Sequence, residues 1–125
     1  MSTTQIALNN VYQALESASF QDNSDQRKVG EEQLNALEII PGCHSFVLDV
    51  SLNTSFPLSV RCFAAIYLKN RIFPYLYKDK PNGIKDDVKI QIRLHLFEMV
   101  KEPNKSLNTE YAFIIANIAG SDFHS

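Results

Sequence analysis

Two pairs of neighbouring residues have the types that catalysis uses. Asp86 and Asp87 are adjacent carboxylates, a combination that can serve general acid–base chemistry. Cys43 and His44 are the residue types of a thiol nucleophile and its base. Consecutive positions on a helix do not face each other, so neither pair can act as a couple there. The two aspartates are better explained as a solvated helix start, and no active site is predicted.

Metal and nucleotide sites are not indicated either. The histidines, His44, His95 and His124, lie too far apart to match the ligand spacing of a metal site. The four glycines are dispersed, and the sequence contains neither G-x-x-x-x-G-K-[ST] nor G-x-G-x-x-G. We therefore expect a chain that is not an enzyme and that needs no metal or cofactor.

Composition narrows the class of protein further. A length of 125 residues suits one domain, and 45% apolar residues can form its core. The net charge of −2 offers no basic surface for nucleic acid or an anionic membrane. Cys43 and Cys62 lie in apolar patterns, and no secretory signal or membrane-spanning run is visible. We expect a soluble protein of a reducing compartment, with free, buried cysteines.

Apolar residues recur at helical spacing along most of the chain. A clear stripe is Tyr111, Ile114, Ile115 and Ile118, followed by Gly120, which suits a C-terminal cap. Six helices are expected, at about 4–18, 25–39, 43–53, 57–73, 85–101 and 107–119.

Proline and glycine set the expected helix boundaries. Pro41 and Gly42 should stop the second helix. Pro57 is favoured in the first turn of the fourth helix because it lacks only an N–H that would be unpaired there. That helix should end near Phe73, since the residue before Pro74 is disfavoured in the α region.

The fifth segment supports two interpretations. Residues 88–97 alternate strictly between apolar and polar, which is typical of a half-buried strand, and Asn82–Gly83 is a strong turn signal. A hairpin over about 75–97 would make the domain α+β. The same segment also carries a helical stripe, formed by Ile92, Leu96, Met99 and Val100.

Helix pairs would begin near residues 4, 43 and 85, a spacing of about 40 residues. That spacing is in the range of HEAT or armadillo repeats, although a plain helical bundle would give the same pattern.

Residues 57–70 carry the strongest family signal, because the core of this helix is apolar on every side and closes with Lys69 and Asn70. Together with Leu34 and Pro41–Gly42 upstream, it resembles the N-terminal domain of the importin-β (karyopherin-β) family. The residues that carry the match within the helix are Arg61, Ala65, Leu68, Lys69 and Asn70. Gly30 departs from the family's usual alanine, at a cost of about 1 kcal/mol inside a helix.

The resemblance implies an all-α, right-handed α-solenoid of about three HEAT-type helix pairs. It decides the fifth segment in favour of a helix at about 85–101, and it places repeats at about 4–40, 43–73 and 85–120. Because the last helix is strongly apolar and solenoids need polar caps, we expect the chain to be the N-terminal piece of a longer solenoid.

The function implied by the resemblance is nuclear transport. A karyopherin binds the GTP form of Ran through its first repeats, carries a cargo protein, contacts FG nucleoporins and shuttles between cytoplasm and nucleus through the nuclear pore. The FG nucleoporin sites are expected beyond this chain, and no nucleic acid or membrane insertion is expected. The alternative is a HEAT-repeat scaffold or adaptor outside nuclear transport.

The second helix of each pair should face the partner, as in the family. The candidate Ran-binding residues are therefore Arg27, Glu31, Ala65, Lys69, Asn70 and Asn117. Lys69 and Asn70 have an ordinary explanation as well, since they can simply complement and cap the end of their helix. Leu34, Leu68 and Arg61 are expected to be structural, with Arg61 bonded inside the repeats to an acidic group such as Glu38 or Asp49.

Overall fold

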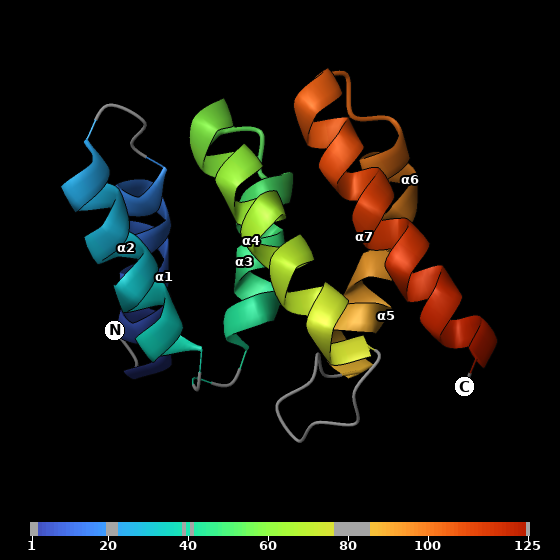
Figure 1. The fold of residues 1–125 in the computed structure, drawn as a ribbon, viewed down its shortest axis with the longest axis horizontal. Coiled ribbons are helices and arrows are strands. Elements are labelled where there is room, and N and C mark those ends of the chain that lie inside the picture. Colours follow the sequence, from blue (N-terminus) through green and yellow to red (C-terminus); the bar gives the residue numbers. More distant parts are fainter. Residues whose placement is uncertain (1–2, 20–22, 39, 41, 77–85, 125) are drawn as a thin grey trace. The chain divides into compact units, whose positions relative to one another are not determined.

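The computed structural model describes residues 3–19, 23–38, 40, 42–76 and 86–124, and these residues form helices and no strand (Figure 1). The all-α class is thus confirmed. The seven helices found there are α1 (Thr3–Ala18), α2 (Ser24–Leu37), α3 (Cys43–Leu52), α4 (Leu58–Leu76), α5 (Asp86–Leu94), α6 (Leu96–Val100) and α7 (Lys105–His124).

The chain divides into two compact units, Met1–Ala64 and Ala65–Ser125, and the boundary falls within α4. The first unit holds α1, α2, α3 and the start of α4. The second holds the rest of α4 with α5, α6 and α7. Each unit has its own buried apolar residues, so each is described by itself.

In the first unit, α1 and α2 pack along each other at very short range. A Cβ on Gly30 of α2 would lie 2.4 Å from the backbone nitrogen of Ala18 and 2.8 Å from the carbonyl oxygen of Ala14. Only glycine, which has no Cβ, allows the two backbones to come this close. The residue that lowers the helix propensity of α2 at position 30 is therefore the residue that its packing against α1 requires. Val11, Leu15 and Leu34 are fully buried in this unit.

The connection from α2 to α3 depends on Gly42. Gly42 has φ of 85° and precedes the first residue of α3, and its carbonyl oxygen accepts a bond from the Phe46 N–H at 2.9 Å. This left-handed conformation favours glycine because it has no Cβ. The prediction that the second helix ends before the Pro41–Gly42 pair is confirmed, because α2 ends at Leu37. Pro41 itself lies outside the described residues.

The predicted end of the fourth helix near Phe73 is wrong. The carbonyl of Pro57 accepts the first helical bonds, from the N–H groups of Val60 and Arg61, both at 3.1 Å. The helix then continues through Pro74 to Leu76. A proline removes one N–H and crowds one carbonyl, which a helix tolerates more readily in its last turn than in its middle.

The fifth segment is helical, so the strand interpretation of residues 88–97 is wrong. The alternation of apolar and polar residues was misleading because two of its apolar residues, Ile90 and Leu94, are exposed. The buried residues Val88 and Ile92 are four positions apart, as on one face of a helix. The expected hairpin turn at Asn82–Gly83 lies outside the described residues.

The expected single helix at 85–101 is divided at His95 into α5 and α6. Hydrogen bonds still cross the break, from the His95 N–H to the Gln91 carbonyl at 3.1 Å and from the Met99 N–H to the His95 carbonyl at 3.0 Å. Of the predicted stripe, Ile92 and Met99 are buried, whereas Leu96 and Val100 are exposed.

The last helix, α7, begins after Asn104, whose side-chain oxygen accepts the Leu107 N–H at 3.0 Å as an N-terminal cap. Of the predicted stripe, Tyr111, Ile114 and Ile118 are buried, as is Leu107 one turn earlier, whereas Ile115 is only half-buried. Gly120 does not cap the helix as predicted, because α7 continues to His124. A glycine inside a helix costs about 1 kcal/mol, which does not prevent its continuation.

Candidate functional site

Two predicted site residues of the first unit, Arg27 and Glu31, lie on α2. They are one turn apart on the helix and both are exposed. Gly30 and Leu34, each three residues further along α2, are buried, so Arg27 and Glu31 lie at the exposed side that borders the buried stripe of the helix. This side can therefore offer a guanidinium and a carboxylate to a protein partner.

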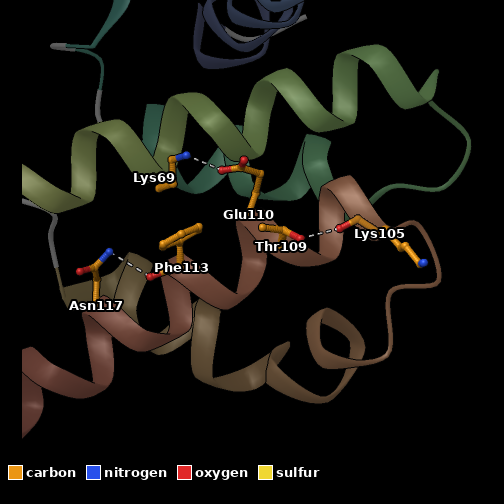
Figure 2. A network of polar contacts seen from close by, with 6 residues as sticks. All are labelled: Lys69, Lys105, Thr109, Glu110, Phe113 and Asn117. Atoms are coloured by element: carbon orange, nitrogen blue, oxygen red, sulfur yellow. Dashed lines mark hydrogen bonds and ion pairs between the residues drawn. The ribbon is translucent and has the colours of Figure 1, made fainter.

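In the second unit, Lys69 of α4 is already engaged. Its Nζ lies 2.6 Å from Oε2 of Glu110 on α7, and the two side chains are 26% and 18% exposed (Figure 2). The ammonium also lies 5.4 Å from the ring centroid of Phe113, within the range of a cation–π contact. Lys69 is thus held between an acid and an aromatic ring, more firmly than an isolated surface lysine.

The other predicted residues of the second unit differ in accessibility. Asn70 is exposed at the position after Lys69. Asn117 is half-buried, and its side-chain amide donates to the carbonyl of Phe113 at 2.9 Å along α7 (Figure 2). Ala65 is fully buried and offers no surface to a partner in this structure. A methyl group without accessible surface can influence a partner only through packing.

Arg61 is buried and hydrogen-bonded within the first unit. Its Nε donates to the carbonyl of Ser51 at 2.9 Å, and the residue is buried. This bond goes to a backbone carbonyl in the last turn of α3, and the acidic partner suggested by the sequence, Glu38 or Asp49, stays a prediction. A cation there also complements the negative end of the helix. The other two structural residues, Leu34 and Leu68, are fully buried.

Sequence reasoning missed Glu110 and Phe113, the two residues that surround Lys69. Both lie on the predicted last helix, but neither belongs to its apolar stripe. Phe113 is 53% exposed, an unusual position for a large aromatic side chain. The position of Phe113 outside the apolar stripe was the one sequence feature that could have indicated its exposure. Nothing in the sequence connects residue 113 to residue 69.

Cys43 and Cys62 are thiols that are not joined in a disulfide; Cys43 is buried, as predicted, whereas Cys62 is half-buried. Burial, reinforced by the nearby Glu38 carboxylate, raises the pKa of the Cys43 thiol to about 11. A thiol with such a pKa is protonated at neutral pH and is a poor nucleophile.

Within the described ranges, no group of three or more histidine, cysteine, aspartate or glutamate side chains is arranged to hold a metal ion. Over the same part of the chain, no helix is both long and apolar enough to cross a membrane.

These features define the fold class, an all-α chain whose helices bury one face and expose polar and some aromatic side chains on the other. A family model described as the importin-beta N-terminal domain matches residues 30–102, more than half of the chain. The chain belongs to the importin-β family.

The relatives found agree with this assignment. The chain is 38% identical over 116 residues to the "Importin beta-like protein KAP120" of Saccharomyces cerevisiae, an alignment that covers 91% of this chain and 11% of that protein. It is 32% identical over 112 residues to "Importin-11" of Homo sapiens and of Mus musculus, covering 90% of this chain and 11% of each. The chain therefore spans about a tenth of the length of these relatives. No solved structure matches it significantly.

Proposed function

We propose that this chain is the Ran-binding part of a nuclear transport receptor, and that it recognises Ran in its GTP form. The observation that carries the proposal is the family match over residues 30–102, which includes Lys69 and Asn70. The helix pairs α1–α2 and α3–α4, followed by α5–α6 with α7, suit a right-handed solenoid of HEAT-type repeats at about 4–40, 43–73 and 85–120.

The contact residues of the proposed site lie on the second helix of each pair. Arg27 and Glu31 on α2 and Asn70 on α4 are exposed and polar, so they can pair with a partner without any rearrangement. Lys69 and Asn117 have intramolecular partners and would contact Ran only with some adjustment of those contacts. Ala65 is left out of the contact set because it is buried.

The mechanism requires only that Ran–GTP binds two receptor states with different affinity. If the binding of Ran–GTP and the binding of a cargo protein are coupled, Ran–GTP changes the affinity of the receptor for cargo, and cargo changes its affinity for Ran–GTP by the same factor. The whole receptor would carry cargo, contact FG nucleoporins through parts beyond this chain, and shuttle between cytoplasm and nucleus through the pore. No nucleotide-binding motif is needed in this chain, because the guanine nucleotide is on Ran.

The proposal is tested by nuclear magnetic resonance on the isotope-labelled 125-residue chain. Unlabelled Ran is added, loaded either with a non-hydrolysable GTP analogue or with GDP. We expect amide shifts around Arg27, Glu31 and Asn70 with the GTP form only. Arg27→Glu should weaken the shifts, whereas the neighbouring Lys28→Glu, also exposed, serves as the control for a general change of charge. Equal shifts with both nucleotides would contradict the proposal and favour a HEAT-repeat scaffold outside transport.

A further inference from the structure

Residues 88–96 carry a sequence pattern that the folded chain does not use. The segment is V-K-I-Q-I-R-L-H-L, with an apolar residue at every second position and a polar residue between each two. In a strand, successive side chains point to opposite faces, so all the apolar side chains would lie on one face. The structure instead forms a helix here, which runs through α5 into α6. One segment thus carries two patterns, of which the native state uses the helical one.

The helical conformation leaves much of the apolar surface of this segment in water. Ile90, Leu94 and Leu96 are 53%, 77% and 41% exposed, whereas Val88 and Ile92 are buried. Residues four apart share a face of a helix, and residues two apart point away from each other. Val88, Ile90 and Ile92 are also β-branched, which favours a strand over a helix. A strand with one covered face would bury side chains that the helix leaves exposed.

The two helices that contain the segment are short. α5 has nine residues and α6 has five, and between them His95 has φ and ψ of −103° and 11°, outside the α-helical region. Isolated helices shorter than about 12–15 residues are marginal in water, so they depend on packing. α5 and α6 bury Val88, Ile92 and Met99, whereas the 20-residue α7 buries Leu107, Tyr111, Ile114 and Ile118. We therefore expect α5 and α6 to open locally before α7 does.

We propose that residues 88–96 form a latent strand, which pairs with the same segment of a second copy of the chain once α5 has opened. The partner is a second copy because the pattern is complementary to itself, with one apolar face that an identical face can cover. Segments of this length with alternating apolar and β-branched residues and without proline or glycine are typical of self-assembling strands.

The charges of the polar face determine the direction of pairing. In parallel strands in register, Lys89 would lie beside Lys89 of the neighbouring copy, and Arg93 beside Arg93, which is unfavourable. In an antiparallel pair centred on Ile92, Lys89 lies opposite His95, and Arg93 lies opposite Gln91. The antiparallel arrangement therefore avoids placing like residues of the fully charged types opposite each other.

The apolar face agrees with the same antiparallel register. With residue 92 opposite residue 92, Val88 lies opposite Leu96, and Ile90 lies opposite Leu94. Every apolar side chain of the segment then meets an apolar side chain of the second copy, and such cross-strand pairs stabilise a sheet. The two side chains that are most exposed in the native helix within this segment, Ile90 and Leu94, become partners.

Local opening is tested by native-state hydrogen exchange of the full chain, followed by nuclear magnetic resonance. The amides of Ile90 and Ile92 should exchange at least about tenfold faster than those of Tyr111 and Ile114. Equal protection of the two helices would overturn the opening step and the inference with it.

Strand pairing is tested by incubating the full chain below the midpoint of its denaturant unfolding, with thioflavin T fluorescence as the readout. Infrared spectra of the assemblies should show antiparallel sheet. Ile90→Glu and Leu94→Glu should each slow assembly at least about tenfold, because each buries a charge in the apolar face of the pair. Both side chains are exposed in the native helix, so the variants should fold, and thermal unfolding checks this.

Val29→Glu is the matched control, since Val29 on α2 is 51% exposed and the substitution makes the same change of charge. This variant should assemble at the rate of the wild type. Assemblies that keep a helical spectrum would show folded chains joining through exposed apolar surface, and would overturn the latent strand. Parallel sheet would overturn the antiparallel register. Wild-type rates for Ile90→Glu and Leu94→Glu, an equally slow Val29→Glu, or a wild type that does not assemble would overturn the role of this segment.

Discussion

Gly30 of α2 lies so close to Ala18 of α1 that a side chain on Gly30 would overlap the backbone of α1. The nearest atoms are the backbone nitrogen of Ala18 and the carbonyl oxygen of Ala14, at 2.4 and 2.8 Å from the position a Cβ would take. Backbone atoms cannot move aside as a flexible side chain can, so the two helices would have to separate.

Gly30→Ala is therefore expected to destabilise the protein, although alanine is the better helix former. Overpacking costs about 1–3 kcal/mol, and contacts this short with backbone atoms belong to the upper part of that range, above the propensity gain of about 1 kcal/mol. Chemical denaturation measures the change in free energy of unfolding. Gln33→Ala, at an exposed position of the same helix, should be neutral or slightly stabilising. A Gly30→Ala variant more stable than wild type would contradict the close approach.

Arg61→Met should destabilise the chain because it removes the bond from Nε to the Ser51 carbonyl. Hydrogen bonds to charged groups contribute about 1.5–3 kcal/mol, and the buried carbonyl would lose this charged donor. The measurement is again the free energy of unfolding. Lys28→Met, which removes an exposed charge from α2, should change it by less than about 0.5 kcal/mol.

We expect the free energy of unfolding to fall at alkaline pH because of the raised pKa of Cys43. Burial raises its pKa from 9.0 to about 11, so the folded state keeps the thiol proton after the unfolded state has released it. The unfolded state then binds fewer protons, and stability falls as the pH rises from about 9 to about 11. Below pH 9 the thiol is neutral in both states and this contribution is fully present.

The measurement for Cys43 is the free energy of unfolding against pH for wild type and Cys43→Ala. The difference between the two curves isolates this thiol from the lysines and tyrosines that titrate in the same range. A difference that stays constant between pH 8 and pH 11 would contradict the raised pKa. Alkylation at pH 8 offers a second readout, with Cys62 reacting faster than Cys43 because it is less buried.

Much of the fold could be predicted from local signals. The apolar stripe of α7 and the turn before α3 follow from residue spacing and from Gly42. Residues 88–97 could not be assigned from periodicity, because exposed Ile90 and Leu94 hide the helical pattern. Proline and glycine rules failed at Pro74 and Gly120, where helices continue despite a local cost.

The candidate site could be predicted only in part. Lys69 and Asn70 stand out through a family resemblance, and Arg61 through its place in a buried helix. The ion pair of Lys69 with Glu110 joins residues 41 positions apart, and no local pattern encodes such a contact. Burial of Ala65 agrees with the apolar core of its helix, and only the family resemblance placed this residue among the contact residues.

The central claim is selective recognition of the GTP form of Ran, and a pair of calorimetric titrations tests it most directly. The 125-residue chain is titrated with Ran bound to a non-hydrolysable GTP analogue and, separately, with Ran bound to GDP. We expect saturable binding to the GTP form and an affinity at least about tenfold lower for the GDP form, a difference of about 1.4 kcal/mol. Equal affinities, or no binding to either form by a chain shown to be folded and helical, would contradict the account.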